Sequence, residues 1–130
     1  MPTPGSLTDA DSEILAAVDE LLGKVRELVK GQKTTTAGLL ISQLNPILRG
    51  WANYHRHIVA KETFNYVDYR VWKLLWQWCR RRHNNRHKRW IKAKYFKSMG
   101  PRNWTFSGVI PDDKIVRLLY TNDIPIKRHI

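Results

Sequence analysis

Apolar residues recur every three or four positions in the early part of the chain. The members of this stripe are Ile14, Leu15, Val18, Leu21, Leu22, Val25, Leu28 and Val29. Residues at that spacing share one face of a helix. Thr8 or Asp9 offers an N-cap, and acidic residues follow where the helix dipole favours them. Because Gly31 can end such a helix, the pattern predicts an amphipathic helix over about 9–31.

Two further helices are predicted in the next segment. The Thr34–Thr36 run can cap a helix that carries Leu39, Leu40 and Leu44. Asn45-Pro46 then breaks or restarts it, because asparagine is a good N-cap and proline fits the first helical position. The third helix runs to about Val59. Its predicted inward residues are Ile47, Leu48, Trp51, Ala52, His55, Ile58 and Val59, and its outward residues are Arg49, Asn53 and Arg56.

A fourth helix, capped by Thr63 and reaching about Arg82, has the clearest separation of faces. At about 100° per residue, one arc collects Phe64, Val67, Val71, Leu74, Leu75 and Trp78. The opposite arc collects Arg70, Lys73, Gln77 and Arg81. This pattern predicts a helix with one buried side and a basic ridge on the other. Asn84-Asn85 breaks it, and a shorter basic helix is predicted over 86–96.

The residue pattern changes after Met99-Gly100-Pro101, where the helical part is predicted to end. Beyond it, β-type alternation, turn residues and prolines predict a small hairpin or an extended segment. The expected fold class is mainly α, a bundle of about four to five helices with a small β-hairpin or extended C-terminal appendage. The expected division is a flexible leader over 1–8, a helical domain over 9–100 and the appendage over 101–130.

The charge of the chain is high and unevenly placed. Among 130 residues, 23 lysines and arginines stand against 11 acids, which gives a net charge of +12. Every charged residue between Asp68 and Asp112 is basic. Such a balance favours a polyanionic partner, and nucleic acid is the commonest one. Without a polyanion, the self-repulsion of an acid-free stretch is costly.

Composition and motifs exclude several classes of function. No apolar run approaches the ~20 residues of a membrane helix. Cys79 is the single cysteine, which excludes an internal disulfide and a multi-cysteine zinc site and fits a reducing, intracellular compartment. We interpret it as a small buried hydrophobe, because it follows the apolar arc of the fourth helix.

Catalytic motifs are also missing from the sequence. It has no glycine-rich phosphate loop and no paired acids at a spacing suited to two-metal catalysis. His83 and His87 are four positions apart, but a helix break separates them and no third ligand is evident. We therefore predict no metal, no cofactor and no catalytic residue, and we do not expect this chain to be an enzyme.

The basic faces and the 86–97 segment supply the candidate nucleic-acid contacts, because lysine and arginine bind phosphates through charge and hydrogen bonds. The predicted contacts are Arg49, Asn53, Arg56, Arg70, Lys73, Arg80, Arg81, Arg82, Arg86, Lys88, Arg89, Lys92, Lys94 and Lys97. Tyr54, Tyr69 and Trp76 border these faces and are candidates for stacking on unpaired bases. For Tyr69 and Trp76, packing at the edge of the core is favoured over stacking.

Several motifs, in their order and spacing, resemble the maturase-specific domain of group II intron-encoded proteins, also called domain X. The most specific is LNPILRGWANYHRH at 44–57, followed by RRHNNRHKRWIKAKYF at 81–96 and NWTFS at 103–107. The resemblance covers roughly 21–130. It implies a thumb-like helical bundle that follows the fingers and palm of a reverse transcriptase. It also implies that the domain binds structured intron RNA and assists its splicing and mobility.

The resemblance further implies partners and a setting. The partners would be group II intron RNA, the upstream reverse-transcriptase fingers and palm, and a DNA target or primer–template duplex, with no membrane involved. The setting would be a bacterial cytoplasm or an organelle. In the family the Tyr-Ala-Asp-Asp type polymerase motif lies upstream, and nothing like it occurs in this sequence. The chain is therefore expected to be an isolated domain or a truncated fragment that stops before a C-terminal region.

Two alternative functions stay open at this point. The first is a DNA-binding module of a mobile element, with the fourth helix in the major groove. The second is a structural docking domain for the polymerase palm, which would use the aromatic residues at the surface.

Overall fold

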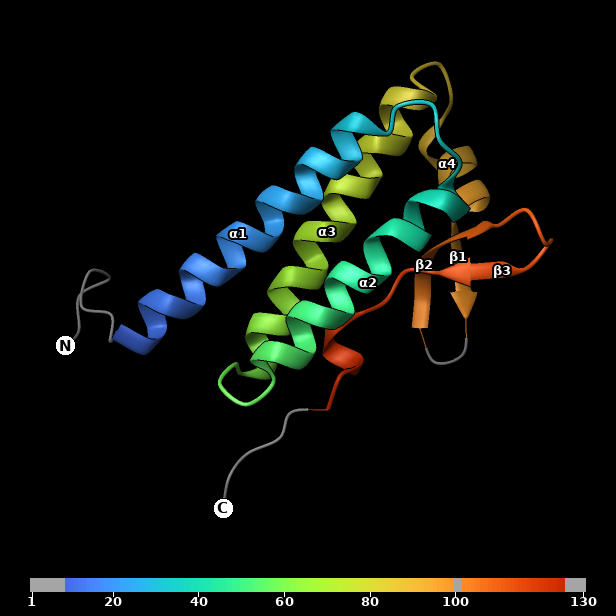
Figure 1. Cartoon of the computed structure of the whole chain (residues 1–130). Coiled ribbons are helices and arrows are strands. Elements are labelled where there is room, and N and C mark those ends of the chain that lie inside the picture. Colours follow the sequence, from blue (N-terminus) through green and yellow to red (C-terminus); the bar gives the residue numbers. More distant parts are fainter. Residues whose placement is uncertain (1–8, 100–101, 126–130) are drawn as a thin grey trace.

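The computed structural model describes residues 9–99 and 102–125, which form four α-helices, a three-stranded sheet and a 3-10 turn (Figure 1). The helices are α1 (Asp9–Gly31), α2 (Ala37–His55), α3 (Lys61–Arg82) and α4 (Lys88–Tyr95). The strands are β1 (Phe96–Met99), β2 (Arg102–Val109) and β3 (Ile115–Arg117), and the turn is η1 (Thr121–Asp123). This confirms the mainly α class. The leader predicted over 1–8, Gly100-Pro101 and 126–130 lie outside the described residues.

The three long helices form a bundle in which α2 runs antiparallel to α1 and α3 (Figure 1). Their apolar stripes meet in one core, in which Val25, Leu40, Ile41, Leu44, Val67, Val71 and Leu75 are almost fully buried. Burying one such side chain contributes about 1.5–3 kcal/mol. The stripe predicted for α1 is confirmed at Val18, Leu21 and Leu22, whereas Leu15 is 49% exposed.

α2 is one continuous helix, so the break predicted at Asn45-Pro46 was wrong. Thr36 is its N-cap, as expected, and accepts a hydrogen bond from the Leu39 amide at 3.3 Å. Asn45 does not cap a helix. Its side-chain amide donates to the Arg117 carbonyl at 2.9 Å and accepts from the Leu119 amide at 2.8 Å, which ties α2 to the segment around β3. Pro46 lies inside the helix, where it lacks the amide that would otherwise continue the ladder.

α3 begins at Lys61, two residues before its predicted cap. Ala60 is the N-cap and makes no side-chain capping bond, so the assignment of Thr63 as the cap was wrong. The apolar arc is confirmed, with Phe64, Val67, Val71, Leu75 and Trp78 buried. In the turn before α3, Val59 is buried as predicted, whereas Ile58 is 58% exposed.

The chain passes from helix to strand earlier than the sequence predicted. α4 ends at Tyr95, and Phe96 already pairs with Phe106 of β2. The sheet has the order β1-β2-β3 and both pairings are antiparallel. Phe96 and Phe106 are buried with their ring centroids 5.4 Å apart, and they belong to the same core as the helices.

At the start of α2, the helix and β2 approach so closely that only glycine fits on either side. A Cβ atom on Gly38 would lie 2.3 Å from the carbonyl oxygen of Val109. A Cβ atom on Gly108 would lie 2.3 Å from the backbone nitrogen of Gly38. In both cases the obstacle is backbone, which cannot rotate out of the way. The sheet is therefore docked on the bundle backbone to backbone.

A single carboxylate anchors η1 to α3. Asp68 accepts hydrogen bonds from the Thr121 amide at 2.8 Å, the Thr121 hydroxyl at 2.7 Å and the Asn122 amide at 3.0 Å. Thr121 is fully buried, and its hydroxyl also lies 3.2 Å from the Phe64 carbonyl. The Asp68 carboxylate is thus directed at the C-terminal segment.

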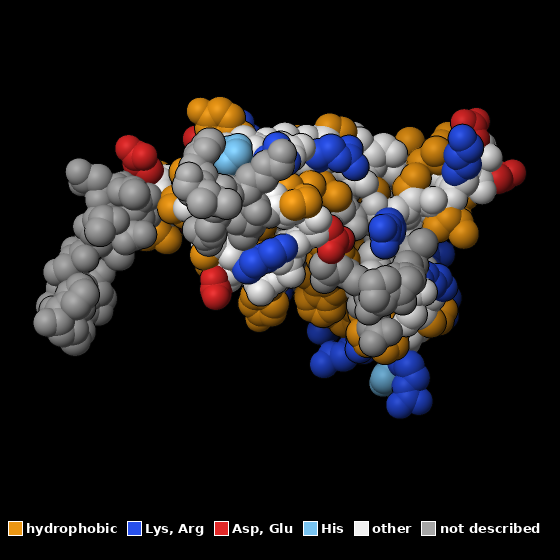
Figure 2. Space-filling view, turned by 90° about the horizontal axis from the view of Figure 1, so that it is seen from below, with side chains coloured by type: hydrophobic (Ala, Val, Ile, Leu, Met, Phe, Trp, Pro, Cys, Tyr) orange, Lys and Arg blue, Asp and Glu red, His pale blue; other side chains and the backbone are white. Residues whose placement is uncertain are grey.

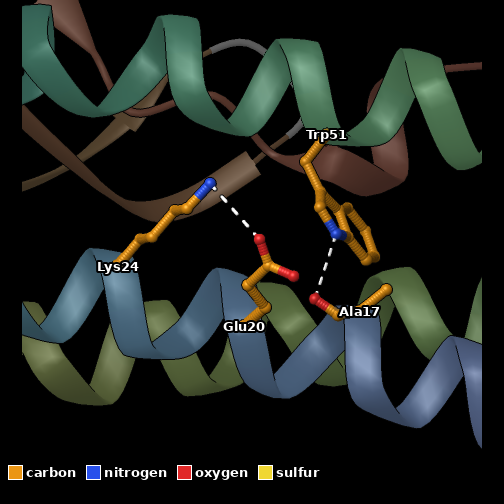
Figure 3. A network of polar contacts seen from close by, with 4 residues as sticks. All are labelled: Ala17, Glu20, Lys24 and Trp51. Carbon is orange, nitrogen blue, oxygen red and sulfur yellow. Dashed lines mark hydrogen bonds and ion pairs between the residues drawn. The ribbon is translucent and has the colours of Figure 1, made fainter.

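Trp51 fastens α2 to α1. Its indole nitrogen donates to the Ala17 carbonyl at 3.2 Å, beside an exposed ion pair between Glu20 and Lys24 at 3.5 Å (Figure 3). The Trp51 and His55 rings are both half-buried, with centroids 4.7 Å apart. This agrees with the prediction that both residues serve packing.

Cys79 is fully buried in the core, as the sequence predicted. Burial raises the pKa of its thiol to about 12, and the nearby Arg82 only partly opposes that rise. A thiol with so high a pKa carries almost no thiolate at neutral pH, and the thiolate is the reactive form. Cys79 is therefore a packing residue and not a nucleophile.

Candidate nucleic-acid interface

Most of the predicted contact residues project from the surface of the bundle. The exposed ones are Arg49, Asn53, Lys73, Arg80, Arg81, Arg82, Arg86, Lys88, Arg89, Lys94 and Lys97, and Arg56, Arg70 and Lys92 are partly buried. Along the lower edge of Figure 2, lysine and arginine side chains gather beside a histidine, with no acidic side chain among them. The molecule therefore presents a local concentration of positive charge.

The fold divides the predicted contacts between the two ends of the bundle. α2 starts beside the sheet and runs away from it, so Arg49 and Asn53 lie toward the end opposite α4 (Figure 1). α3 runs back toward α4 (Figure 1). We give the name α3–α4 basic surface to cations of α3, of α4 and of the turn between them. Its members are Arg70, Lys73, Arg80, Arg81, Arg86, Lys88, Arg89, Lys92 and Lys94.

Two cations of α3 make cation–π contacts with tyrosine rings of the same helix. The Arg70 guanidinium lies 5.6 Å from the centroid of the Tyr66 ring and donates to the Tyr66 hydroxyl at 2.6 Å. One turn away, the Lys73 ammonium lies 5.5 Å from the Tyr69 ring. Both pairs have the four-residue spacing that places side chains together on a helix. A cation held by a ring keeps its full charge, whereas a carboxylate partner would neutralise it.

The cations of α4 and of the preceding turn are held in the same way. Arg86 lies 4.8 Å from the Trp90 ring centroid, and Lys94 lies 5.5 Å from it. Lys92 lies 4.2 Å from the centroid of the Trp104 ring on β2. These rings order the cationic side chains before any ligand binds. Binding then costs less side-chain conformational entropy.

No ion pair joins these cations to a carboxylate among the described residues. Among the side chains that the structure describes, the one ion pair is that of Lys24 with Glu20 on α1. Asp68, the nearest acid in the sequence, directs its carboxylate at η1. The positive charge of the α3–α4 basic surface is therefore not neutralised from within the described residues.

His83 and His87 have structural roles in the turn before α4. His83 Nε2 and the Tyr95 hydroxyl share a hydrogen bond of 2.6 Å. Burial holds the pKa of His83 below its usual range, and the charges of Lys94, Arg82 and Arg86 lower it further. Both effects favour the neutral imidazole. His87 is the N-cap of α4, with its Nδ1 accepting from the Arg89 amide at 3.1 Å.

Two of the predicted contact residues donate hydrogen bonds within the protein, and a third has a buried nitrogen. The Arg82 guanidinium donates to the carbonyls of Lys33, Thr34 and Thr35, and it lies 4.7 Å from the Trp78 ring. It thus fastens the loop between α1 and α2. Lys97 donates to the Ala93 carbonyl at 2.5 Å. The Nε of Arg56 is buried and has no hydrogen-bond partner among the described atoms.

The three stacking candidates differ in exposure. Tyr54 is 81% exposed and Tyr69 is 56% exposed, so both side chains are accessible to a ligand. The preference for packing of Tyr69 over stacking stays a prediction. Trp76 packs against the core, as preferred. Its ring stacks on that of Trp72 at 5.7 Å, with an interplanar angle of 4°.

Two exposed aromatic residues of this region were not predicted from the sequence to take part in binding. Tyr66 is 48% exposed and Trp104 is 47% exposed, and each lies under a cation. The spacing of Tyr66 and Arg70 on one helix could have revealed the first pair. No local signal could have revealed the second, because Lys92 and Trp104 meet only through the fold.

Two further features bear on function. Among residues 9–99 and 102–125, no group of three or more histidine, cysteine, aspartate or glutamate side chains is placed to hold a metal ion. Within the same ranges, no helix has the length and apolarity needed to cross a membrane.

The chain matches the protein family described as group II intron, maturase-specific domain, over residues 18–96. That stretch begins within α1 and ends at the first residue of β1, so it contains the helical bundle and α4. No curated protein matches the chain. Because the family match covers more than half of the 130 residues, this protein belongs to the group II intron maturase-specific domain family.

Proposed function

We propose that this chain binds folded group II intron RNA through the α3–α4 basic surface and thereby assists splicing and mobility of the intron. The proposal rests on how the cations of that surface are held and on their charge. Aromatic rings hold them, and no described carboxylate neutralises them. The family points to the RNA as the partner, since a maturase acts on its intron.

The chemistry of this surface suits positioning of RNA. Arginine and lysine bind phosphate oxygens through charge and hydrogen bonds without reading sequence. Folded RNA brings phosphates of different strands close together, and clustered cations relieve the resulting repulsion. The surface spans two helices and a turn, so it can contact several strands at once. On this proposal the protein stabilises the active fold of the RNA, and the RNA carries out the chemistry.

The proposal predicts a preference between nucleic acids at a fixed salt concentration. The chain should bind a folded group II intron RNA at least about tenfold more tightly than a duplex DNA of the same length. Filter binding or fluorescence anisotropy, at one stated ionic strength, measures both affinities. An RNA of identical composition whose fold has been scrambled is the control. Equal or tighter binding of the duplex DNA would favour the DNA-binding alternative instead.

We further propose that the chain acts as the thumb of a reverse transcriptase and docks on its palm with the end of the bundle opposite α4. Three exposed apolar side chains belong to the elements at that end. Leu15 is 49% exposed, Tyr54 is 81% exposed and Ile58 is 58% exposed. This end carries fewer of the predicted RNA contacts, so one molecule can engage both partners.

Tyr54→Ala separates docking on the palm from RNA binding. The change should weaken association with a separately expressed fingers–palm fragment by about tenfold, because exposed tyrosines are frequent anchors at interfaces. It should leave RNA affinity within about twofold, since Tyr54, although a stacking candidate in the sequence, lies at the end of α2 away from α4 and is not part of the α3–α4 basic surface. Analytical ultracentrifugation or surface plasmon resonance follows the first effect. A variant that loses both activities equally would contradict the division of roles.

A further inference from the structure

Trp104 has a backbone conformation that is unusual for a large side chain. Its φ angle is 58°, in the left-handed region that favours glycine. It lies in an irregular part of the β1–β2 pairing. Lys97 pairs with Thr105 and Met99 with Arg102, so two residues of β2, Asn103 and Trp104, stand opposite the single residue Ser98. Such a bulge usually places glycine at the left-handed position.

The Trp104 indole is turned outward by this bulge. The next three residues of β2, Thr105, Phe106 and Ser107, are buried, whereas Trp104 is 47% exposed. Strained positions of this kind are held by the structure around them and cluster at functional sites. A glycine here would relieve the strain, and a polar residue would suit the exposure better. A large aromatic ring thus occupies a position where both the backbone conformation and the exposure to solvent are unfavourable for it.

Three cations on one side of α4 lie toward this ring. Lys92 of α4 lies over the indole at 4.2 Å from its centroid. Lys88 and Arg89 precede Lys92 by four and three residues, so they lie on the same side of α4, and both are exposed. α4 contains no acid. The arrangement is that of proteins that bind single strands, where cations follow the phosphates and an aromatic ring receives a base.

We propose that Trp104 is a stacking platform for an unpaired nucleobase of the bound RNA. Lys92 orients the indole from one face, and Lys88 and Arg89 hold the phosphates that flank the stacked nucleotide. This inference rests on the proposed function. It adds one subsite to it, whose ligand is an unpaired nucleotide beside a helical region of the RNA. Duplex RNA cannot use the subsite, since its bases are already stacked and paired.

Trp104→Gly tests the platform, because glycine removes the ring and accepts the φ of 58° without strain. At fixed salt, the variant should bind an eight-nucleotide oligouridylate about tenfold more weakly than the unchanged protein. Its affinity for a twelve-base-pair RNA duplex should change by less than about twofold. Trp104→Phe retains a ring and should recover most of the oligouridylate affinity. Circular dichroism melting establishes that each variant is folded.

A second measurement uses the unchanged protein and does not depend on the folding of any variant. An oligouridylate that contains 5-iodouridine, bound and irradiated, should crosslink at Trp104, as located by mass spectrometry of the peptides. Crosslinks only at other residues would overturn the proposal, and so would an oligouridylate affinity that is the same with and without the ring. If the unchanged protein bound neither probe with any dependence on salt, the proposed function itself would fail.

Discussion

Gly108→Ala is expected to lower the free energy of unfolding by about 3 kcal/mol, because overpacking against fixed atoms costs roughly that amount. The new methyl group would lie 2.3 Å from the Gly38 nitrogen and 2.8 Å from the Ala37 carbonyl carbon. These atoms belong to the first turn of α2, and Gly108 is paired with Val116 in the sheet. Relief of the clash would therefore require the sheet to move off the bundle. Urea unfolding followed by circular dichroism measures the change.

Gly50→Ala is the matched control for this substitution. Gly50 lies inside α2, and a Cβ atom there would have nothing within 4 Å. Alanine at an unobstructed helix position is expected to stabilise the fold by about 0.5–1 kcal/mol. The same chemical change should thus have opposite signs at the two sites. If both variants had the same unfolding midpoint, the close approach of α2 and β2 would be refuted.

The helical stripes could be predicted from the sequence because they are local. Positions three and four apart fix the buried faces of α1 and α3 whatever lies around them. The continuity of α2 could not be predicted in this way. Asn45-Pro46 has the local features of a helix start, but the partners of the Asn45 side chain, Arg117 and Leu119, lie more than 70 residues away. A contact so distant in sequence leaves no trace in the local pattern.

The charge of the candidate interface could also be predicted from the sequence, but its arrangement could not. The acid-free stretch identified nearly all the exposed cations of α3 and α4. It did not distinguish Arg82, whose guanidinium serves three carbonyls of the α1–α2 loop, from its exposed neighbour Arg81. Composition gives the number of charges, and only tertiary contacts decide which of them are free to bind a ligand.

The combined substitution Arg86→Ala, Lys88→Ala and Arg89→Ala is expected to weaken RNA binding by about 10- to 100-fold at 0.1 M salt and to leave the fold at least as stable. Lys88 and Arg89 lie in the first turn of α4, which contains no acid. Cations there oppose the helix dipole at a cost of about 0.3–1 kcal/mol each, and alanine is the best helix former. His87, the N-cap of α4, is retained. The salt dependence of binding should also decrease, by about 0.7–0.9 in the log–log slope for each phosphate that the variant no longer binds.

A second triple variant, Lys24→Ala, Lys114→Ala and Arg117→Ala, removes the same amount of charge from exposed positions outside the α3–α4 basic surface. Its RNA affinity should fall by less than about threefold, because the long-range part of the attraction is screened within about 10 Å at this salt concentration. Equal reductions of affinity in the two triple variants would mean that total charge attracts the RNA and that no particular surface binds it. A reduction confined to the α4 variant, together with unchanged or higher thermal stability, would show that these cations contribute to binding at a cost to the helix. That combination is expected of residues at a binding surface and not of residues that serve the fold.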